Sequence, residues 1–284
     1  MLAPLKNLAL EARAAGRGLG AFNVIHLEHA EILVHAAEQV GLPIVLQISE
    51  NAVKFHHGQL APLAKATLEI ARNTPARVAV HLDHAKDLDL VRQAIGLGFS
   101  SVMYDGSHLP DDENRNTTRL VAGWCHDNGV TIEAELGEVG GKDGAHAPGA
   151  RTDPDDAHQF VADTGVDLLA VAVGSSHAMT TRDASLDLEL IAQLADKVPV
   201  PLVLHGSSGV SDENMAAAIR AGMTKINVST HLNRIYTEQI RRTLAENPDV
   251  VDSRKWSKPA ARAMQDEVQR LLLHYRAQVD AGTG

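Results

Sequence analysis

The feature that most constrains the fold is an eightfold alternation between short apolar runs and longer segments with helical spacing. The runs, each predicted to form a strand, are Gly20–Val24, Ile44–Ile48, Val78–Asp83, Ser101–Tyr104, Thr131–Glu135, Leu168–Val173, Pro201–His205 and Lys225–Val228. The segments between them place apolar residues three to four positions apart, as in Ala30, Leu33 and Ala37. Strands that are apolar on both faces and separated by helices are typical of a parallel sheet covered on each side.

Eight such units in 284 residues match a closed (β/α)8 barrel, the TIM barrel, better than an open doubly wound sheet, which stays the alternative. Local signals mark helix boundaries, with Asp212 opening one helix and Gly41 closing another just before Pro43. No internal repeat or linker divides the sequence. We therefore expect a single barrel domain over residues 1–284, with a helical C-terminal extension at about Lys258–Val279.

Composition narrows the class of partner. The chain has 26 Lys and Arg against 36 Asp and Glu, and the resulting formal charge of −10 argues against nucleic-acid or acidic-membrane partners. Cys125 is the only cysteine, so the chain cannot form an internal disulfide, which is compatible with a reducing compartment. No apolar run reaches the ~20 residues of a membrane span. We expect a cytoplasmic protein that acts on a small molecule.

Histidines gather at predicted strand ends, where barrels of this kind carry their active residues. His84, His177 and His205 follow three different strands, and three neutral imidazoles in a triangle suit Zn²⁺ while leaving a fourth position open. His81 lies deeper in its strand, and we expect it to pack inside the barrel. The remaining histidines of the N-terminal region are assigned mostly to solvated surfaces: His26, His29, His35, His56 and His57.

Carboxylates occupy the same rim. Asp83 precedes His84, and strand alternation predicts that the two side chains point in opposite directions. Beside a cation, Asp83 can move a proton to a substrate oxygen, or alternatively it orients a metal-bound histidine. Asp105 and Glu135 can hold a second or alternative cation. Glu133 shares the strand face of Glu135, and either glutamate can instead form a buried pair with Lys or Arg.

The last two strand ends favour a phosphate. The segment Gly206–Gly209 offers backbone N–H groups and two hydroxyls with little bulk, and Asn227–Thr230 leads into a helix whose N-terminal amides attract anions. Barrels commonly bind phosphate after strands seven and eight. The longest turn-rich segment, Gly137–Asp156, is expected to move without ligand and to order over the site with substrate; a solvated surface loop is the alternative.

Motifs along nearly the whole chain resemble the class II, metal-dependent ketose-bisphosphate aldolases, the family of fructose- and tagatose-bisphosphate aldolases. The motifs that carry the resemblance are Gly20–Val24, Gln47–Ser49, His81–His84, Glu133–Gly137, Gly140–Gly141, His177, Leu204–Gly209 and Lys225–Thr230. The resemblance implies that His84, His177 and His205 are ligands of a catalytic Zn²⁺ and that Asp83 is the proton donor. It also implies a second divalent metal position at Asp105 and Glu135, a monovalent cation (Na⁺ or K⁺) near the phosphate, and a homodimer or homotetramer.

The resemblance further implies the substrate contacts. The positions concerned are Asn23, Ser49, Ala178, Gly206, Ser207, Ser208, Asn227, Val228, Ser229 and Thr230, the first two lying near the other half of the sugar. The chain departs from the family at Ala178, where glycine is usual, and at Thr180, where tyrosine is common. The loop after Gly141 is shorter and reads Lys142-Asp143-Gly144, so we expect Asp143 to replace the usual loop glutamate as the base.

The implied reaction is reversible cleavage of a ketose phosphate, such as fructose 1,6-bisphosphate, to dihydroxyacetone phosphate and an aldehyde. Tagatose bisphosphate or another ketose phosphate is the alternative substrate. A barrel metallohydrolase would need two histidines one residue apart on the first strand, and Asn23–His26 lacks that pair. A Schiff-base aldolase would need a lysine at the rim, whereas Lys225 is expected at the beginning of its strand. A non-catalytic phosphosugar-binding barrel is the remaining alternative.

Overall fold

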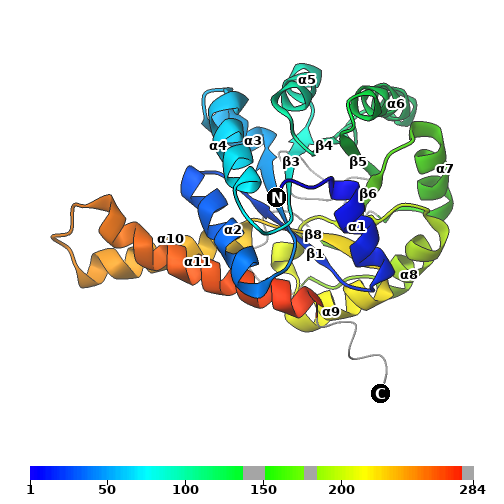
Figure 1. Ribbon diagram of the computed structural model, residues 1–284. Helices are drawn as coiled ribbons and strands as arrows, with labels where there is room; N and C mark the ends of the chain where they lie inside the picture. The colour runs from blue at the N-terminus through cyan, green and yellow to red at the C-terminus, as the bar shows by residue number, and fades with distance from the viewer. Residues whose placement is uncertain (137–150, 176–183, 277–284) are drawn as a thin grey trace.

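A computed structural model describes residues 1–136, 151–175 and 184–276, and these residues contain a closed barrel of eight parallel strands in chain order (Figure 1). The strands are β1 (Leu19–Asn23), β2 (Ile44–Ser49), β3 (Val78–Ala85), β4 (Ser101–Tyr104), β5 (Thr131–Leu136), β6 (Leu168–Val171), β7 (Leu202–Leu204) and β8 (Met223–Val228). The barrel predicted from the sequence is confirmed, and the predicted strands differ from these mainly by one or two residues at their ends. The difference at β8 matters for the site, because the strand begins at Met223 and Lys225 lies within it rather than at its beginning.

The helices form an outer ring around the strands. They are α1 (Leu5–Ala14), α2 (Leu27–Val40), α3 (Glu50–Phe55), α4 (Leu60–Arg72), α5 (Leu88–Leu97), α6 (Asp111–Asp127), α7 (Pro154–Thr164), α8 (Leu188–Lys197), α9 (Asp212–Ala221), α10 (Thr230–Glu246) and α11 (Ser253–Arg276), with a short 3-10 turn, η1 (Ser207–Gly209). Both predicted helix boundaries are confirmed: α9 begins at Asp212, and α2 ends at Gly41, whose φ of 66° is left-handed.

One end of the barrel is closed by the N-terminal helix. Leu5, Leu8 and Ala12 of α1 pack in one buried cluster with residues of five strands: Leu19, Ala21, Val45, Ala79, Leu168, Ala170 and Val203. These strand positions alternate with side chains that pack against the outer helices, as expected from the period of two. The N-terminal end of the barrel is therefore filled largely with apolar side chains.

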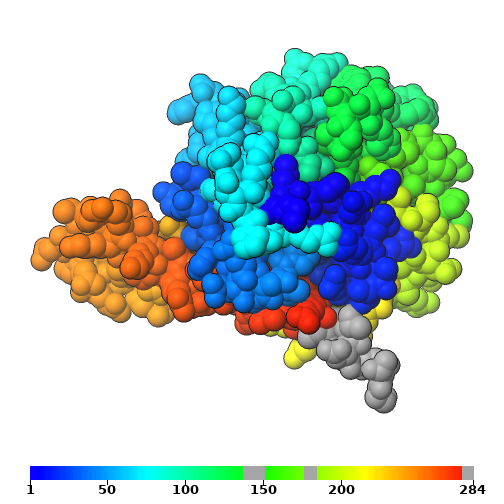
Figure 2. Space-filling model, viewed as in Figure 1, coloured from blue at the N-terminus to red at the C-terminus, as the bar shows by residue number. Residues whose placement is uncertain are grey.

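The last two helices leave the barrel together. α10 and α11 extend beyond the ring of helices as a paired arm (Figures 1 and 2). The C-terminal helical extension is confirmed, but α11 begins at Ser253 rather than near Lys258 and continues through Pro259. Among the described helices, none combines the length and apolar character needed to cross a membrane.

Candidate active site

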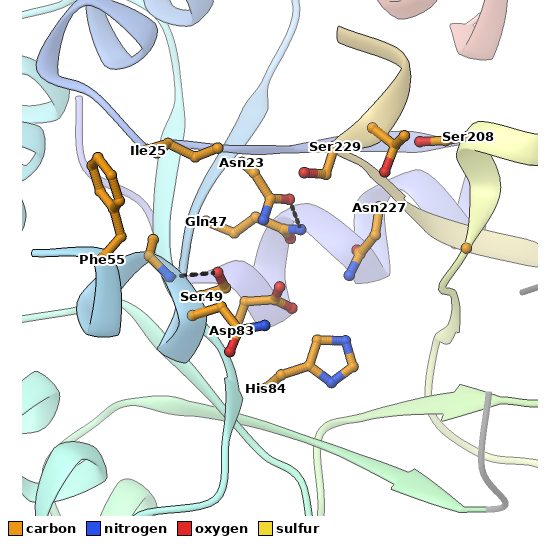
Figure 3. A pocket seen from close by; sticks show the side chains of 14 residues that line it. Asn23, Ile25, Gln47, Ser49, Phe55, Asp83, His84, Ser208, Asn227 and Ser229 are labelled. Atoms are coloured by element: carbon orange, nitrogen blue, oxygen red, sulfur yellow. Dashed lines mark hydrogen bonds between the residues drawn. The ribbon is translucent and has the colours of Figure 1, made fainter. Parts of the chain in front are cut away.

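A pocket of about 460 Å³ lies at the C-terminal ends of the strands. Its lining comes from the ends of β1, β2, β3, β7 and β8 and the loops or helices that follow them: Asn23, Ile25, Gln47, Ser49, Asn51, Ala52, Phe55, Asp83, His84, Gly206, Ser208, Asn227, Ser229 and Thr230. In Figure 3, Asp83 and His84 lie together at one side, Ser208, Asn227 and Ser229 at another, and Ile25 and Phe55 at a third. The sequence predicts an active site at the C-terminal ends of the strands, and this cavity lies there.

A distortion of β3 brings two successive side chains to the pocket. The pairing of β3 with β4 shifts register between Leu82 and Ala85, and His84 has a φ of 50°, a left-handed conformation uncommon for residues other than glycine. The prediction that Asp83 and His84 point to opposite sides was wrong, because it assumed a regular strand. Both residues line the pocket and both are buried. Backbone strain of this kind clusters at functional sites.

Three predicted residues form a group that can hold a metal ion. Ligand atoms of Asp83, His84 and His205 all lie within 4.8 Å of one another, and all three residues are buried. Two imidazoles with a carboxylate are a donor set that suits Zn²⁺. His177, the third predicted histidine ligand, lies outside the described residues, as do Ala178, Thr180 and Asp143. Within the described chain, the residues therefore fit a divalent metal.

Each of the two histidines has a carboxylate at a ring nitrogen. The Nδ1 atom of His84 lies 2.9 Å from Asp105 Oδ2. Burial opposes ionisation of Asp105, but the hydrogen bond and charge of His84 outweigh it and hold the pKa of the carboxyl well below its usual range. A carboxylate at one nitrogen fixes the tautomer and leaves the other nitrogen for a metal. Asp105 is thus placed as a partner of His84, and its predicted second-metal role stays a prediction.

His205 lies between two carboxylates of β5. Its Nε2 atom is 3.2 Å from Glu133 Oε1, and its Nδ1 atom is 3.2 Å from Glu135 Oε2. Burial lowers the pKa of His205, but the hydrogen bonds to Glu133 and Glu135 outweigh this effect and raise the pKa to about 9. The ring of this candidate ligand is therefore held in a defined orientation before any metal binds.

A buried ion pair lies beneath His205. Lys225 Nζ is 2.9 Å from Glu133 Oε2, and both side chains are fully buried. This confirms the alternative that one of the two glutamates forms a buried pair with a lysine. Sequence reasoning missed this role of Lys225. A signal was present, because Lys225 lies two residues before Asn227, which lines the pocket, and residues two apart share one face of a strand.

The other histidines divide between interior and surface. His81 is fully buried and its Nδ1 atom contacts Ser101 Oγ, which confirms the prediction that it packs inside the barrel. His26, His35 and His57 are exposed, and His56 is half-buried. The surface assignment of His29 was wrong: it is 3% exposed, between the rings of His26 and Tyr236, and burial lowers its pKa to about 4.

The predicted phosphate-binding loops lie on one wall of the pocket. Gly206, which has a left-handed φ of 67°, begins η1, and Ser229 directly precedes α10. The Ser207 hydroxyl donates to the carbonyl of Asn227, so the two loops are joined. Ser207 and Val228 are buried behind the wall rather than lining the pocket, whereas the other predicted residues of both loops line it.

The wall formed by β1, β2 and α3 carries the residues expected near the other half of a sugar. Gln47 Nε2 donates to Asn23 Oδ1 at 2.8 Å, and Ser49 Oγ accepts from the Ala52 amide at 3.1 Å as the cap of α3 (Figure 3). Phe55 lies on the same side and is 61% exposed. Sequence reasoning missed Phe55 and Ile25 as pocket residues, because a single apolar residue after a strand carries no signal of its position.

Comparison with known proteins decides the family. The family described as "Fructose-bisphosphate aldolase class-II" matches residues 3–278 of the chain. This protein belongs to that family. It is 34% identical over 272 residues to the D-tagatose-1,6-bisphosphate aldolase subunit GatY of Klebsiella oxytoca, with 94% of this chain and 95% of the relative covered.

Solved structures of aldolases share the fold of this class II aldolase family member. The YdjI aldolase from Escherichia coli K12 superposes with a TM-score of 0.82 at 28% identity, covering 97% of each chain. A candidate fructose-1,6-biphosphate aldolase from Coccidioides immitis superposes with a TM-score of 0.86 at 27% identity, covering 98% of each chain. The resemblance inferred from the sequence motifs is confirmed.

Proposed function

We propose that this protein is a metal-dependent aldolase that reversibly cleaves a ketose phosphate to dihydroxyacetone phosphate and an aldehyde. The observation that carries the proposal is that Asp83 and His84, whose ligand atoms lie within 4.8 Å of one in the buried His205, line the same pocket as two loops suited to phosphate. Membership of the aldolase family supports it. The similarity to GatY favours tagatose 1,6-bisphosphate among the substrates, and fructose 1,6-bisphosphate stays a candidate.

His84 and His205, with His177 as a further ligand, hold the catalytic ion, for which we propose Zn²⁺. When bound, the ion supplies a Lewis acid that polarises the ketone carbonyl. Asp105 would keep the His84 imidazole oriented through its Nδ1 atom, and Glu133 and Glu135 would do the same for the ring of His205. We keep the second divalent metal at Asp105 and Glu135, and the monovalent cation, as proposals from the family resemblance.

The chain's own groups then carry the proton transfers. Gly206, Ser208 and the first turn of α10 bind the phosphate, and this anchors the ketone portion beside His84. Asp143 removes a carbon-bound proton from dihydroxyacetone phosphate in the synthetic direction. Asp83 donates a proton to the oxygen of the aldehyde as the carbon–carbon bond forms. Cleavage runs the same steps in reverse.

A Schiff-base mechanism is the second candidate, and Lys225 is the residue it would use. The Nζ atom of Lys225 pairs with Glu133 and is fully buried beneath the pocket rather than among its lining residues. An amine that attacks a ketone must reach it in neutral form. A paired, enclosed ammonium is poorly suited to this task, which favours the metal-dependent mechanism.

The position of Asp83 allows two roles, metal ligand and proton donor, which Asp83→Asn separates. As a proton donor, the residue is needed for bond cleavage but not for metal binding. We expect the variant to keep its metal content, to lose at least ~100-fold in cleavage rate, and to retain more of the proton exchange on dihydroxyacetone phosphate. Asp89→Asn, on the exposed face of α5, is the matched control. Loss of the metal together with both rates would make Asp83 a ligand instead.

The substrate is identified by product formation. The metal-loaded protein is incubated with dihydroxyacetone phosphate and a panel of aldehydes, with and without a phosphate group, and products are resolved by mass spectrometry and NMR. The proposal predicts a ketose phosphate product with at least one aldehyde, and the configuration at C4 distinguishes fructose-type from tagatose-type addition. Failure with every aldehyde, under conditions in which the metal is bound, contradicts the proposal. Assembly as a homodimer or homotetramer and a cytoplasmic location also stay proposals.

A further inference from the structure

A chain of polar contacts joins the C-terminal helix to the pocket wall. His231, in the first turn of α10, donates its backbone N–H to Ser208 Oγ at 3.2 Å. Its imidazole Nε2 lies 2.6 Å from Glu267 Oε1 on α11, and the two side chains are only 10% and 16% exposed. One residue therefore contacts the pocket wall through its backbone and α11 through its side chain.

The contacts of Glu267 extend this chain to the other loop. Arg270 donates to Glu267 through Nε at 2.8 Å and Nη2 at 2.7 Å, and its Nη1 donates to Asp212 Oδ2 at 2.6 Å. Asp212 is the first residue of α9, shortly after η1, and its carbonyl also accepts from His274 Nε2 at 2.9 Å. The beginnings of α9 and α10, which follow the two phosphate loops, are thus fastened to the same stretch of α11.

The carboxylate at the centre of this network is strongly held in its ionised form. Burial raises the pKa of Glu267, but hydrogen bonds from Arg270 and His231 outweigh this effect and lower the pKa to about 2. Charge-assisted hydrogen bonds of this kind are about twice as strong as neutral ones. The network therefore fixes the rotation and position of the first turn of α10 more firmly than apolar packing alone would.

The hydrogen bond from the His231 amide determines whether the Ser208 hydroxyl can donate to a ligand. Ser208 lines the pocket, and because its oxygen accepts a hydrogen bond from the His231 amide, its own proton is directed elsewhere. A phosphate dianion has only acceptor oxygens and needs donors at fixed positions. A shift of the α10 first turn would move both the Ser208 hydroxyl and the backbone of Ser229 and Thr230, which line the pocket beside it.

We infer that His231 is a positioning residue for phosphate recognition, acting through Glu267 and Arg270 to make α11 a support of the phosphate-binding wall. The inference rests on the proposed function, because it takes the pocket's ligand to be a phosphate ester. It assigns the C-terminal helix a part in substrate affinity, although no residue of α11 lines the pocket. His231 itself does not take part in the proton transfers.

The test is a titration of the metal-loaded protein with inorganic phosphate and with dihydroxyacetone phosphate, by calorimetry. His231→Ala should raise both dissociation constants about tenfold, the effect of losing one charge-assisted contact. His231→Gln, which keeps a donor toward Glu267, should recover part of the affinity. Glu267→Ala should match His231→Ala, and the double variant should lose little more, because the two residues act as one unit. For the enzyme, KM should rise while kcat stays within about twofold.

Asp266→Ala is the matched control, because Asp266 pairs with Arg262 on the exposed side of the same helix. It should leave phosphate affinity unchanged. Unaltered phosphate affinity in folded His231→Ala, or a fall in kcat alone, would overturn the inference. A wild-type protein that binds phosphate and obeys these predictions but cleaves no ketose overturns the proposed function only. A wild-type protein that binds neither phosphate nor dihydroxyacetone phosphate overturns both.

Discussion

The substitution Lys225→Met tests whether the ion pair inside the barrel is as enclosed as the structure indicates. Lys225 Nζ lies 2.9 Å from Glu133 Oε2, and neither side chain is exposed. Methionine keeps most of the volume of lysine but removes the ammonium group from Glu133 Oε2 and leaves the His205 contact at Oε1. Removing one partner of a buried pair costs about 3–5 kcal/mol in the free energy of unfolding, because the remaining charge is stranded in a medium of low polarity.

The chain offers a matched control of the same geometry. Lys6 Nζ lies 2.8 Å from Asp167 Oδ1, but the Lys6 side chain is 52% exposed. Lys6→Met should therefore cost no more than about 1 kcal/mol. Lys225→Met combined with Glu133→Gln should recover more than half of the loss, since neither charge is then buried alone.

Urea unfolding of the metal-free variants, followed by circular dichroism and tryptophan fluorescence, provides the measurement. The dependence of the free energy of unfolding on urea concentration should keep the same slope in every variant, while the urea concentration at the unfolding midpoint changes. If Lys225→Met costs no more than Lys6→Met, water reaches the pair and the enclosed arrangement is refuted. If the double variant is as unstable as the sum of the single ones, the loss does not come from the stranded carboxylate.

Two further predictions concern histidines. His205→Ala should reduce bound zinc, measured by elemental analysis after dialysis, to well below one ion per chain, whereas exposed His35→Ala should not; equal zinc content would exclude His205 as a ligand. Burial lowers the pKa of His29 from 6.5 to about 4, so the folded state takes up a proton less readily than the unfolded state. The contribution of the neutral ring to the free energy of unfolding is therefore complete above pH 6.5 and is lost as the pH falls toward 4. The free-energy difference between wild type and His29→Phe should therefore shift by up to about 3 kcal/mol between pH 7 and pH 4, as measured by urea unfolding. Parallel pH curves for the two proteins would contradict the burial of this ring.

The sequence predicted the barrel and most of the pocket because both depend on local patterns. Eight apolar runs with helical spacing between them specify the strands, and strand ends in a parallel barrel meet at one rim. Asp83, His84, His205 and the residues of the two phosphate loops could therefore be placed together without knowledge of any contact.

What the sequence could not predict depends on contacts between distant segments. The bulge at His84 arises from the pairing of β3 with β4, and it cancels the alternation that was assumed for Asp83. His29 is buried partly by Tyr236, more than two hundred residues later. α11 begins at Ser253, before the predicted start near Lys258, and Pro259 lies within the helix.

In the proposed mechanism a bound metal, rather than a lysine, supports the aldol reaction. The most direct measurement follows the aldol addition of dihydroxyacetone phosphate to an aldehyde in three samples: the Zn²⁺-loaded protein, the protein after removal of metal by EDTA, and the protein after Zn²⁺ is restored. Borohydride trapping is carried out in parallel. We expect activity only in the two metal-loaded samples and no covalent adduct after borohydride. Activity that survives EDTA, with the substrate trapped in stoichiometric amount on a lysine, would contradict this mechanism.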